Sequence, residues 1–350
     1  MFVAWRELRS ARGRFLLIGA VVALITLLVG FLSGLTGGLA LQNVSAVLGV
    51  PADRLVFSAG ADAPSFADSS VTAQQEAEWA ALPGVASVEP LGVLQARAEA
   101  GGARVAVAVL GVDAALGAPA DPGGIALSAP AARALGVGVG DTVSIAGTSA
   151  VVSSIGGDDW YSHTPVVRLP LAAWQALAAS LGTPADATVL AVRGSSDWAA
   201  GEAATGTVSR APLAALSAIG SFRSEIGSLL LMVAMLFGIA ALVVGAFFTV
   251  WTMQRSGDIA VLKALGASTR SLLRDSLGQA LAVLIAGTGA GLLAVVGLGS
   301  LAGTALPFLL SPVTTLAPAA LMIALGLLGA AAALRAVVST DPLTALGSAR

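Results

Sequence analysis

The sequence of 350 residues has no cysteine, one histidine and one lysine, and only 11% of its residues are charged. Without cysteine, no disulfide can hold any part of the chain, and thiols give no information on the redox compartment. The single histidine, His163, does not assemble with a serine and an acid into a recognisable catalytic triad. We therefore expect no hydrolase chemistry from this chain.

The single lysine, Lys263, lies outside any glycine-rich loop, and the motif G-x-x-x-x-G-K-[ST] is absent. That motif cradles nucleotide phosphates, so the chain cannot bind ATP in the usual P-loop manner. Any use of ATP would therefore require a partner. We expect no intrinsic cofactor, no metal site and no binding of nucleic acid.

Apolar side chains are abundant instead: 56% of the residues are hydrophobic and the mean hydropathy is +0.89. These values lie outside the range of ordinary soluble domains. Three windows carry no charged side chain, at residues 15–52, 226–254 and 276–334. Since a bilayer core about 30 Å thick requires ~20 apolar helical residues, each window can hold at least one transmembrane helix.

The third window is much longer than one span requires. Pro307, Pro312 and Pro318 lie past its middle, where proline suits a hairpin between two helices. Small residues such as Gly34 and Gly38 at the outer end of the first span would let another helix approach, within one subunit, at a dimer contact or at a substrate groove. The sequence predicts four spans, at residues 15–39, 226–253, 276–305 and 318–334.

Arginine and lysine near the span ends predict the orientation, because they concentrate on the cytoplasmic side. Ten basic and four acidic residues flank the spans at the two chain ends and at the bend after the second span. Both termini and that bend are therefore expected in the cytoplasm of a multi-pass cell membrane protein. The segment 43–225, with 8 basic and 16 acidic residues, then lies outside.

The outer segment has the size of one domain, with room for two lobes. Thr72 with Gln75 forms a capping-box start for one helix, and Pro170 can open another. Strand patterns occur at residues 54–58, 85–89, 104–110, 142–145, 150–155 and 188–192. The predicted fold is an α-helical membrane protein with four transmembrane helices and one α+β extracytoplasmic domain inserted between helices 1 and 2.

The predicted chain has seven parts. They are a cytoplasmic amphipathic helix at 1–14, the first transmembrane helix with a stalk at 15–42, the extracytoplasmic domain at 43–224, the second transmembrane helix at 225–254, a cytoplasmic coupling elbow at 255–275, helices 3 and 4 at 276–338, and a cytoplasmic tail at 339–350. The first part is either a positive-inside anchor or a second contact for a cytoplasmic partner.

Four motifs resemble those of MacB-type (FtsX-like) permeases. The most specific follows the second span and reads GDIAVLKALGAS, residues 257–268. The family's outer-domain pattern of a small helix, a Gly-Asp turn and a strand pair is matched by ALSAPAARALGVGVGDTVSIAGTSAVVSSIG, residues 126–156. Its earlier helix-to-strand junction is similar to LPGVASVEP at 82–90, and its C-terminal tail to DPLTALG at 341–347. With the order of spans and outer domain, the resemblance covers nearly the whole chain.

This resemblance implies the membrane subunit of an ABC transporter, a homodimer that works with two copies of a separate ATPase subunit. The partner then hydrolyses ATP, and this chain is a transport permease rather than an enzyme. The opening FVAWRELRSARGRF is most similar to the HrtB haem exporter and DevC groups of the family. The expected function is efflux of an amphipathic substrate, with haem the leading candidate. The alternatives are mechanotransmission to an extracytoplasmic partner, and lipid or peptide export.

The elbow holds the residues that we expect to dock the ATPase. Three aliphatic side chains share one helical stripe, the lysine lies off it, and the aspartate stands at the N-terminal end, where the helix dipole favours a carboxylate. The alternative is a solvated connector that only links two spans. The candidate coupling residues are Asp258, Ile259, Leu262, Lys263, Leu265 and Gly266.

Candidate substrate residues gather at the start of the second span. They are Glu225, Met232, Met235 and Arg223. Methionine is among the ligands that haem iron accepts, and Arg223 could pair with a propionate or with Glu225. Glu225 and Met232 would lie on the order of 10 Å apart along a helix, so at most one would ligate iron. In the alternative, Glu225 is a solvated span end and the methionines fill gaps between helices.

The only histidine, His163, is placed by the sequence in an outer loop, residues 157–165, beside Asp158 and Asp159. A metal site requires more converging ligands than this loop offers. We therefore expect a hydrated loop histidine.

Overall fold

The computed structural model describes residues 12–60, 63–254, 257, 261, 268–303 and 305–338. The chain divides into two compact units. The first, Met1–Gly38 with Ser228–Arg350, is called the membrane unit, and the second, Leu39–Gly227, the inserted domain. We describe each unit by itself.

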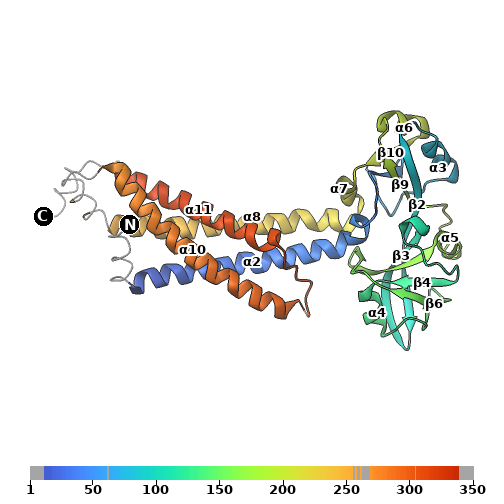
Figure 1. Cartoon of the computed structure of the whole chain (residues 1–350), viewed down its shortest axis with the longest axis horizontal. Helices are drawn as coiled ribbons and strands as arrows, with labels where there is room; N and C mark the ends of the chain where they lie inside the picture. Colours follow the sequence, from blue (N-terminus) through green and yellow to red (C-terminus); the bar gives the residue numbers. More distant parts are fainter. Residues whose placement is uncertain are drawn as a thin grey trace. The chain divides into compact units, whose positions relative to one another are not determined.

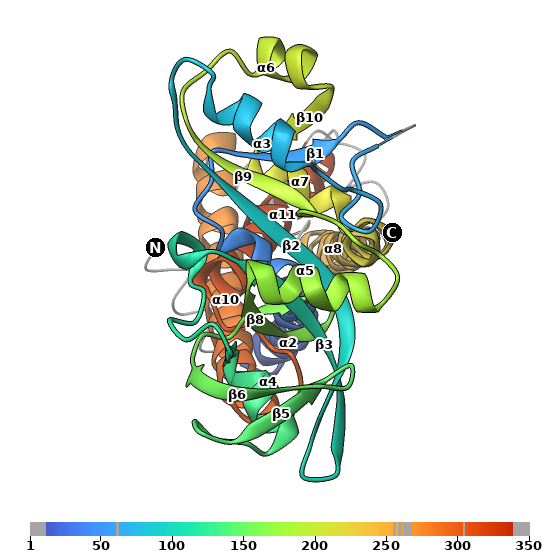
Figure 2. The same ribbon diagram turned by 90° about the vertical axis from the view of Figure 1, so that its right-hand side faces the viewer.

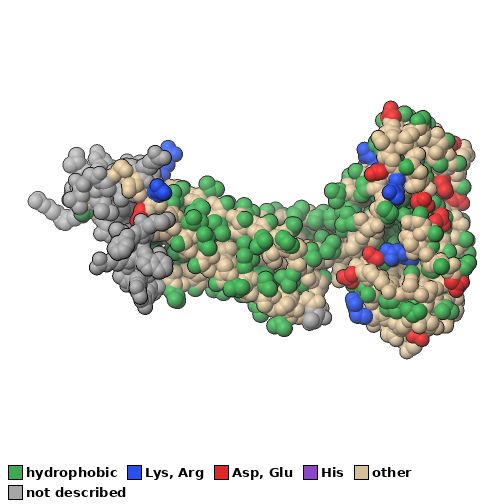
Figure 3. Space-filling view, viewed as in Figure 1, with side chains coloured by type: hydrophobic (Ala, Val, Ile, Leu, Met, Phe, Trp, Pro, Cys, Tyr) green, Lys and Arg blue, Asp and Glu red, His purple; other side chains and the backbone are tan. Residues whose placement is uncertain are grey.

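The membrane unit is built from four long helices (Figure 1). They are α2 (Arg12–Leu48), α8 (Gly220–Gln254), α10 (Thr269–Ala302) and α11 (Pro312–Val338). Each is long and apolar enough to cross a membrane. Hydrophobic side chains cover much of the visible surface of these helices, whereas charged side chains gather on the inserted domain (Figure 3). The prediction of four transmembrane helices is confirmed.

Two details of the helix ends differ from expectation. The first helix continues to Leu48, well beyond the predicted end of span 1, and its residues after Gly38 belong to the inserted domain. Pro318 does not begin the last helix but lies inside α11, which starts at Pro312. Proline is tolerated there because it removes only one backbone donor, and transmembrane helices accommodate such gaps through neighbouring groups.

Glycine allows α2 and α10 to pack closely. A Cβ added at Gly291 would lie 2.6 Å from the Ala23 carbonyl oxygen and 2.7 Å from the Thr26 Cβ. One at Gly287 would lie 2.8 Å from the Gly19 carbonyl oxygen. Because lipid tails are as apolar as leucine, helices in membranes associate largely through such close contacts between small residues.

The loop after α10 covers the glycines at the outer end of the first span. Phe308 packs on Gly34, and the Pro307 carbonyl lies against Gly38. The Leu309 N–H donates to the Gly34 carbonyl oxygen at 3.0 Å. These small residues therefore serve packing within one subunit, the first of the alternatives left open by the sequence.

The inserted domain contains one ten-stranded sheet in the order β10-β1-β9-β2-β3-β8-β4-β6-β5, with β7 beside β8. One end of this sheet is a β-α-β-β-α-β arrangement, in which the strands follow the order β10-β1-β9-β2. Its elements are β1 (Arg54–Ser58), α3 (Ala73–Ala80), β2 (Val85–Ala100), β9 (Val189–Gly194), α6 (Trp198–Thr205) and β10 (Thr207–Arg210).

The other end is nearly a small barrel, because β5 pairs back onto β2 at Ala98 and Glu99 and so closes a ring of six strands. Its further elements are β3 (Ala103–Val112), η1 (Ala114–Leu116), β4 (Gly124–Leu127), α4 (Ala129–Leu135), β5 (Thr142–Ile145), β6 (Thr148–Ile155), β7 (Trp160–Tyr161), β8 (Thr164–Pro170) and α5 (Leu171–Ser180). The 16-residue β2 belongs to both ends and crosses the domain diagonally in Figure 2. The chain returns to α8 through α7 (Pro212–Ala215) and η2 (Leu216–Ala218).

Several local predictions are confirmed. The Thr72 side chain accepts from the Gln75 N–H and the Gln75 side chain accepts from the Thr72 N–H, which completes the capping box of α3. Pro170 precedes α5 as expected. The extracytoplasmic segment is an α+β domain as predicted, although β4, β7, β8 and β10 were not foreseen.

Candidate functional site

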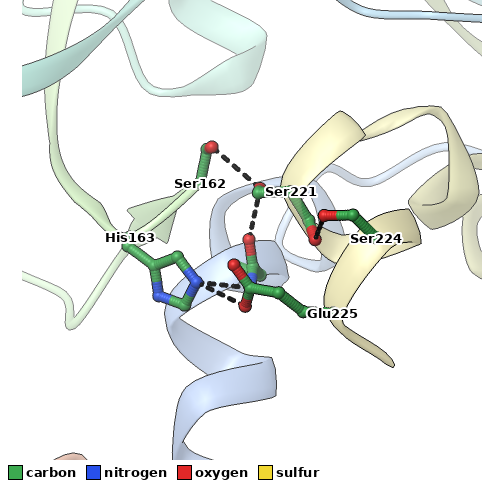
Figure 4. Close-up of polar contacts among 6 residues, drawn as sticks. Ser162, His163, Ser221, Ser224 and Glu225 are labelled. Carbon is green, nitrogen blue, oxygen red and sulfur yellow. Dashed lines mark hydrogen bonds and ion pairs between the residues drawn. The ribbon is translucent and has the colours of Figure 1, made fainter. Parts of the chain in front are cut away.

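Glu225 belongs to a group of hydrogen-bonded side chains that we call the polar cluster, Asn43, Ser162, His163, Ser221 and Glu225 (Figure 4). The Glu225 Oε2 lies 2.8 Å from the His163 Nε2 and accepts from the Asn43 Nδ2 at 3.2 Å. The Ser221 hydroxyl donates to the Asn43 Oδ1, and the hydroxyl oxygens of Ser162 and Ser221 are 2.8 Å apart.

The position of the proton on His163 follows from its neighbours. The Asn43 Nδ2 also lies 2.8 Å from the His163 Nε2, but a carboxylate can only accept. The contact with Glu225 therefore requires an Nε2–H that donates to Glu225, which leaves the Asn43 amide to donate to the same carboxylate oxygen. With the side chains of His163 and Glu225 32% and 39% exposed, water also reaches this pair.

The backbone of the β7–β8 turn holds His163 in place. Ser162 and His163 have φ values of 50° and 62°, which residues with a side chain rarely adopt. This conformation directs two N–H groups to the end of α2, where Ser162 donates to the Asn43 carbonyl at 3.0 Å and His163 to that of Gln42 at 2.9 Å. Since these carbonyls lie in the last two turns of α2, the turn and the helix end stabilise one another.

His163 lies in the β7–β8 turn and is 32% exposed, in line with the expectation of a hydrated loop histidine. It is also bonded, through its backbone N–H to Gln42 of α2 and through its side chain to Glu225 of α8. Asp159, its acidic neighbour in the loop, forms an ion pair with Arg168 at 2.8 Å. In the part of the chain that the structure describes, no three histidine or acidic residues are grouped as a metal site would require.

The remaining substrate candidates lie on α8. Arg223 is exposed, one turn from the beginning of the helix. Met232 and Met235 are 51% and 61% exposed, and both belong to the membrane unit. The structure thus brings Glu225 together with His163 and Asn43, two residues that sequence reasoning missed as its partners. The role of all four candidates in substrate binding stays a prediction.

The coupling candidates Asp258, Ile259, Leu262, Lys263, Leu265 and Gly266 lie outside the described residues. Their role also stays a prediction. The N-terminal amphipathic helix and the C-terminal tail fall outside them as well, except for residues 12–14.

Comparison with known proteins gives the family. Residues 230–342 match the family model for the FtsX-like permease C-terminal region. The chain therefore contains an FtsX-like permease domain. It is 26% identical over 355 residues to the putative hemin transport system permease protein HrtB of Staphylococcus haemolyticus, with 99% of each chain covered. It is 27% identical over 362 residues to an uncharacterised ABC transporter permease of Mycobacterium tuberculosis H37Rv, again with 99% of each covered.

Two solved structures are also similar to this FtsX-like permease. One is the extracellular domain of the ABC-type transporter YknZ from Gram-positive bacteria, at 16% identity and a TM-score of 0.32, covering 47% of this chain and 91% of that one. The other is the periplasmic region of MacB from Actinobacillus actinomycetemcomitans, at 10% identity and a TM-score of 0.36, covering 47% and 92%.

This domain and the four apolar helices indicate an ABC-type permease and a multi-pass cell membrane protein, with a β-rich domain inserted between helices 1 and 2. Membership of this class implies an ATPase partner. A transporter subunit is the role that the family supports.

Proposed function

We propose that this FtsX-like permease is the membrane subunit of an efflux transporter, a homodimer powered by two copies of a separate ATPase, and that it exports haem. The observation that carries the proposal is similarity over 99% of both chains to a relative named as a hemin transport permease. Both termini and the elbow at residues 255–275 would then face the cytoplasm, where an ATPase can reach them.

The chemistry at the start of α8 supports this substrate. In the inserted domain, the His163 imidazole is of a kind that ligates haem iron, and exposed Arg223 can pair with a propionate. Met232, in the membrane unit, carries a thioether, another kind of haem ligand. The Nε2 of His163 is occupied by Glu225, so ligation by this nitrogen would break that contact. Binding of haem would then open the polar cluster.

A titration of the permease in lipid nanodiscs with haem tests the substrate. We expect a saturable shift of the haem absorbance, weakened in His163→Ala or Met232→Ala and strengthened in Glu225→Ala, which frees the His163 Nε2. The matched control is Met253→Ala. Met253 lies on the same helix and is 61% exposed, as Met235 is. An unchanged haem spectrum with the parent protein would remove haem from the proposal.

Energy coupling through the elbow requires a separate test. Leu262→Asp places a charge in the predicted apolar stripe and should uncouple the partner's ATP hydrolysis from transport without unfolding the permease. Lys263→Ala, off the stripe, is the control. Equal coupling in both variants, measured in reconstituted complexes, would contradict docking at the elbow.

The polar cluster favours a second candidate, mechanotransmission to an extracytoplasmic partner. It joins the end of α2, the beginning of α8 and the β7–β8 turn, so a relative movement of the two helices would strain its hydrogen bonds. A ligand or partner would shift such a movement only through different affinity for its two states.

Because the chain contains no cysteine, this joint can be locked specifically. The Ser162 and Ser221 hydroxyl oxygens are 2.8 Å apart, a suitable starting geometry for an introduced disulfide. If movement at the polar cluster is required, the double variant Ser162→Cys with Ser221→Cys should lose the ATP-driven activity of the complex under oxidising conditions. Reduction of the disulfide should restore that activity. Full activity of the oxidised variant would show that the cluster stays closed during function. If the titration above shows no binding of haem, export of a lipid or a peptide remains the alternative.

A further inference from the structure

The inserted domain holds a cavity of about 580 Å³ to which the proposed function assigns no ligand, although Ser162 and Ser221 of the polar cluster line part of it. Its walls come from β2, α5, the β7–β8 turn, the start of α8 and two loops, all within residues 66–221. The volume lies in the range of small-molecule sites, roughly 300–1,000 Å³. Phe66 and Tyr161 supply apolar surface, and Gln95, Thr188 and Ser70 polar groups.

One edge of β2 is interrupted at this cavity. On that edge β9 pairs with residues 85–91 and β5 with residues 98–99, and in the part of the chain described here no strand pairs with it between them. At Val93, the first unpaired position, the side chain of Thr188 takes the place of a partner strand. The Val93 N–H donates to the Thr188 Oγ1 at 2.8 Å, and the Thr188 hydroxyl donates to the Val93 carbonyl oxygen at 3.3 Å. At the far end the Ala146 N–H donates to the Arg97 carbonyl at 3.0 Å.

Gln95 lies between these two covered positions. The register of β2 with β3 is continuous from Gly92 to Ala100, so hydrogen-bonding groups alternate regularly along the strand. Val93 and Arg97 direct their backbone hydrogen-bonding groups to the interrupted edge. The N–H and carbonyl of Gln95, two residues from each, therefore point to that edge as well. The N–H and the carbonyl of Gln95 therefore face the cavity as one donor and one acceptor, spaced as on the unpaired edge of a β-strand.

The wall contains a second unsatisfied group. The Trp174 ring packs on Gly92 and Gly111, where a Cβ would collide with it, and the side chain is 2% exposed. Its Nε1 has no hydrogen-bond partner among the residues that the structure describes. A buried N–H without an acceptor costs about 1–3 kcal/mol, so a carbonyl that reached it after a small shift of the wall would be favourable.

We propose that this cavity binds a short peptide in extended conformation, which adds to the free edge of β2 at Gln95. One residue of an antiparallel peptide supplies both groups, because its N–H can donate to the Gln95 carbonyl while its own carbonyl accepts from the Gln95 N–H. Among the described residues that line the cavity, Asp68 is the only acidic or basic one. The site therefore suits uncharged or cationic peptides.

The test uses the full chain in nanodiscs with 5-fluorotryptophan, whose Trp174 signal is assigned with Trp174→Phe. We expect N-acetyl-trialanine amide, titrated up to about 10 mM, to shift this signal in a saturable way. Maltose, a neutral hydroxyl-rich molecule of similar size, should not. Stronger binding of trialanine amide would indicate a free peptide whose ammonium meets Asp68, and equal or weaker binding an internal segment of a partner protein.

Gln95→Pro removes the proposed donor while Gln95→Ala keeps it. The N–H of Gln95 faces away from β3, so proline is compatible with the pairing that remains. We expect Gln95→Pro to weaken peptide binding about fivefold or more and Gln95→Ala to leave it unchanged. Ser70→Trp, an exposed wall position, should block the cavity and serves if the proline variant does not fold. No saturable shift with either peptide, binding of maltose instead, or equal affinity of all folded variants would overturn the proposal.

Discussion

The two units of this permease differ in how closely the backbone segments within each unit approach one another. In the membrane unit, glycine removes side chains so that helix backbones approach, as Gly291 of α10 does beside Ala23 of α2. In the inserted domain, large side chains fill the interior, and Trp79 and Phe57 are fully buried. Water drives burial of apolar area in the second case, whereas lipid gives no such advantage in the first.

Buried polar groups differ between the units as well. In the membrane unit the hydroxyls of Thr26 and Thr288 are buried without a partner among the described residues. In the inserted domain the buried amide of Asn43 is bonded on both sides, and Trp174 is the exception. Other buried polar side chains of the membrane unit are paired, as Thr252 is with the Phe248 carbonyl oxygen, so unpaired groups are exceptions in both units.

The largest effect is expected from emptying the interior of the inserted domain. Trp79→Ala removes a fully buried ring that stacks on Trp198 and donates to the Thr207 Oγ1 at 3.0 Å. We expect the free energy of unfolding to fall by about 3–5 kcal/mol. Thermal or denaturant unfolding of the purified permease measures this loss. Leu213→Ala, at a site 76% exposed, should change little, and equal stability of the two variants would contradict the packing described.

Overfilling the membrane unit should be the next largest effect. Gly291→Val forces a side chain against the α2 backbone at a place where even a Cβ has no room, and we expect a loss of about 1–3 kcal/mol. The control is Gly289→Val on the same helix, where an added Cβ meets nothing within 4 Å. Thermal unfolding in detergent compares the two. If both variants melt alike, close glycine packing does not hold α2 against α10.

Much of the fold could be predicted because its signals are local. Charge-free windows gave the four spans, and one capping box gave the start of α3. The length of β2 was not predicted, since its second half, with the segment LQARAEA, has the composition of a helix. Strand pairing overrides that local preference, and pairing partners are distant in the sequence.

The candidate site shows the same limit more sharply. Glu225 was identified from its position at a span boundary, but His163 is 62 residues and Asn43 182 residues away from it. No spacing in the sequence relates three residues on α2, a β turn and α8. Only the folded inserted domain brings them together, and the same holds for the interrupted edge of β2.

A smaller effect is expected at the polar cluster, which is satisfied but reached by water. Asn43→Ala removes bonds to Glu225 and Ser221, while Glu225 keeps His163. We expect a loss of about 1 kcal/mol in unfolding free energy. Gln42→Ala is the matched control, because Gln42 accepts from His163 through its backbone carbonyl, which alanine preserves. An equal loss of unfolding free energy in Gln42→Ala would show that alanine near the end of α2, and not the loss of the polar cluster, is responsible.

The smallest effect is expected from the charge of one side chain in the inserted domain. The predicted spans of the membrane unit carry no charged side chain. Burial first, and then the carboxylates of Asp113, Glu89 and Asp186, raise the pKa of Glu76 above its ordinary value of 4.5. The folded state thus binds the proton more tightly than the unfolded state, so stability falls as pH rises from 4.5 through the folded pKa. Glu76→Gln should therefore raise the melting temperature slightly at pH 7 and lose this advantage below about pH 4, with Asp68→Asn as the exposed control. An advantage of equal size at both pH values would show that it does not come from the charge of Glu76.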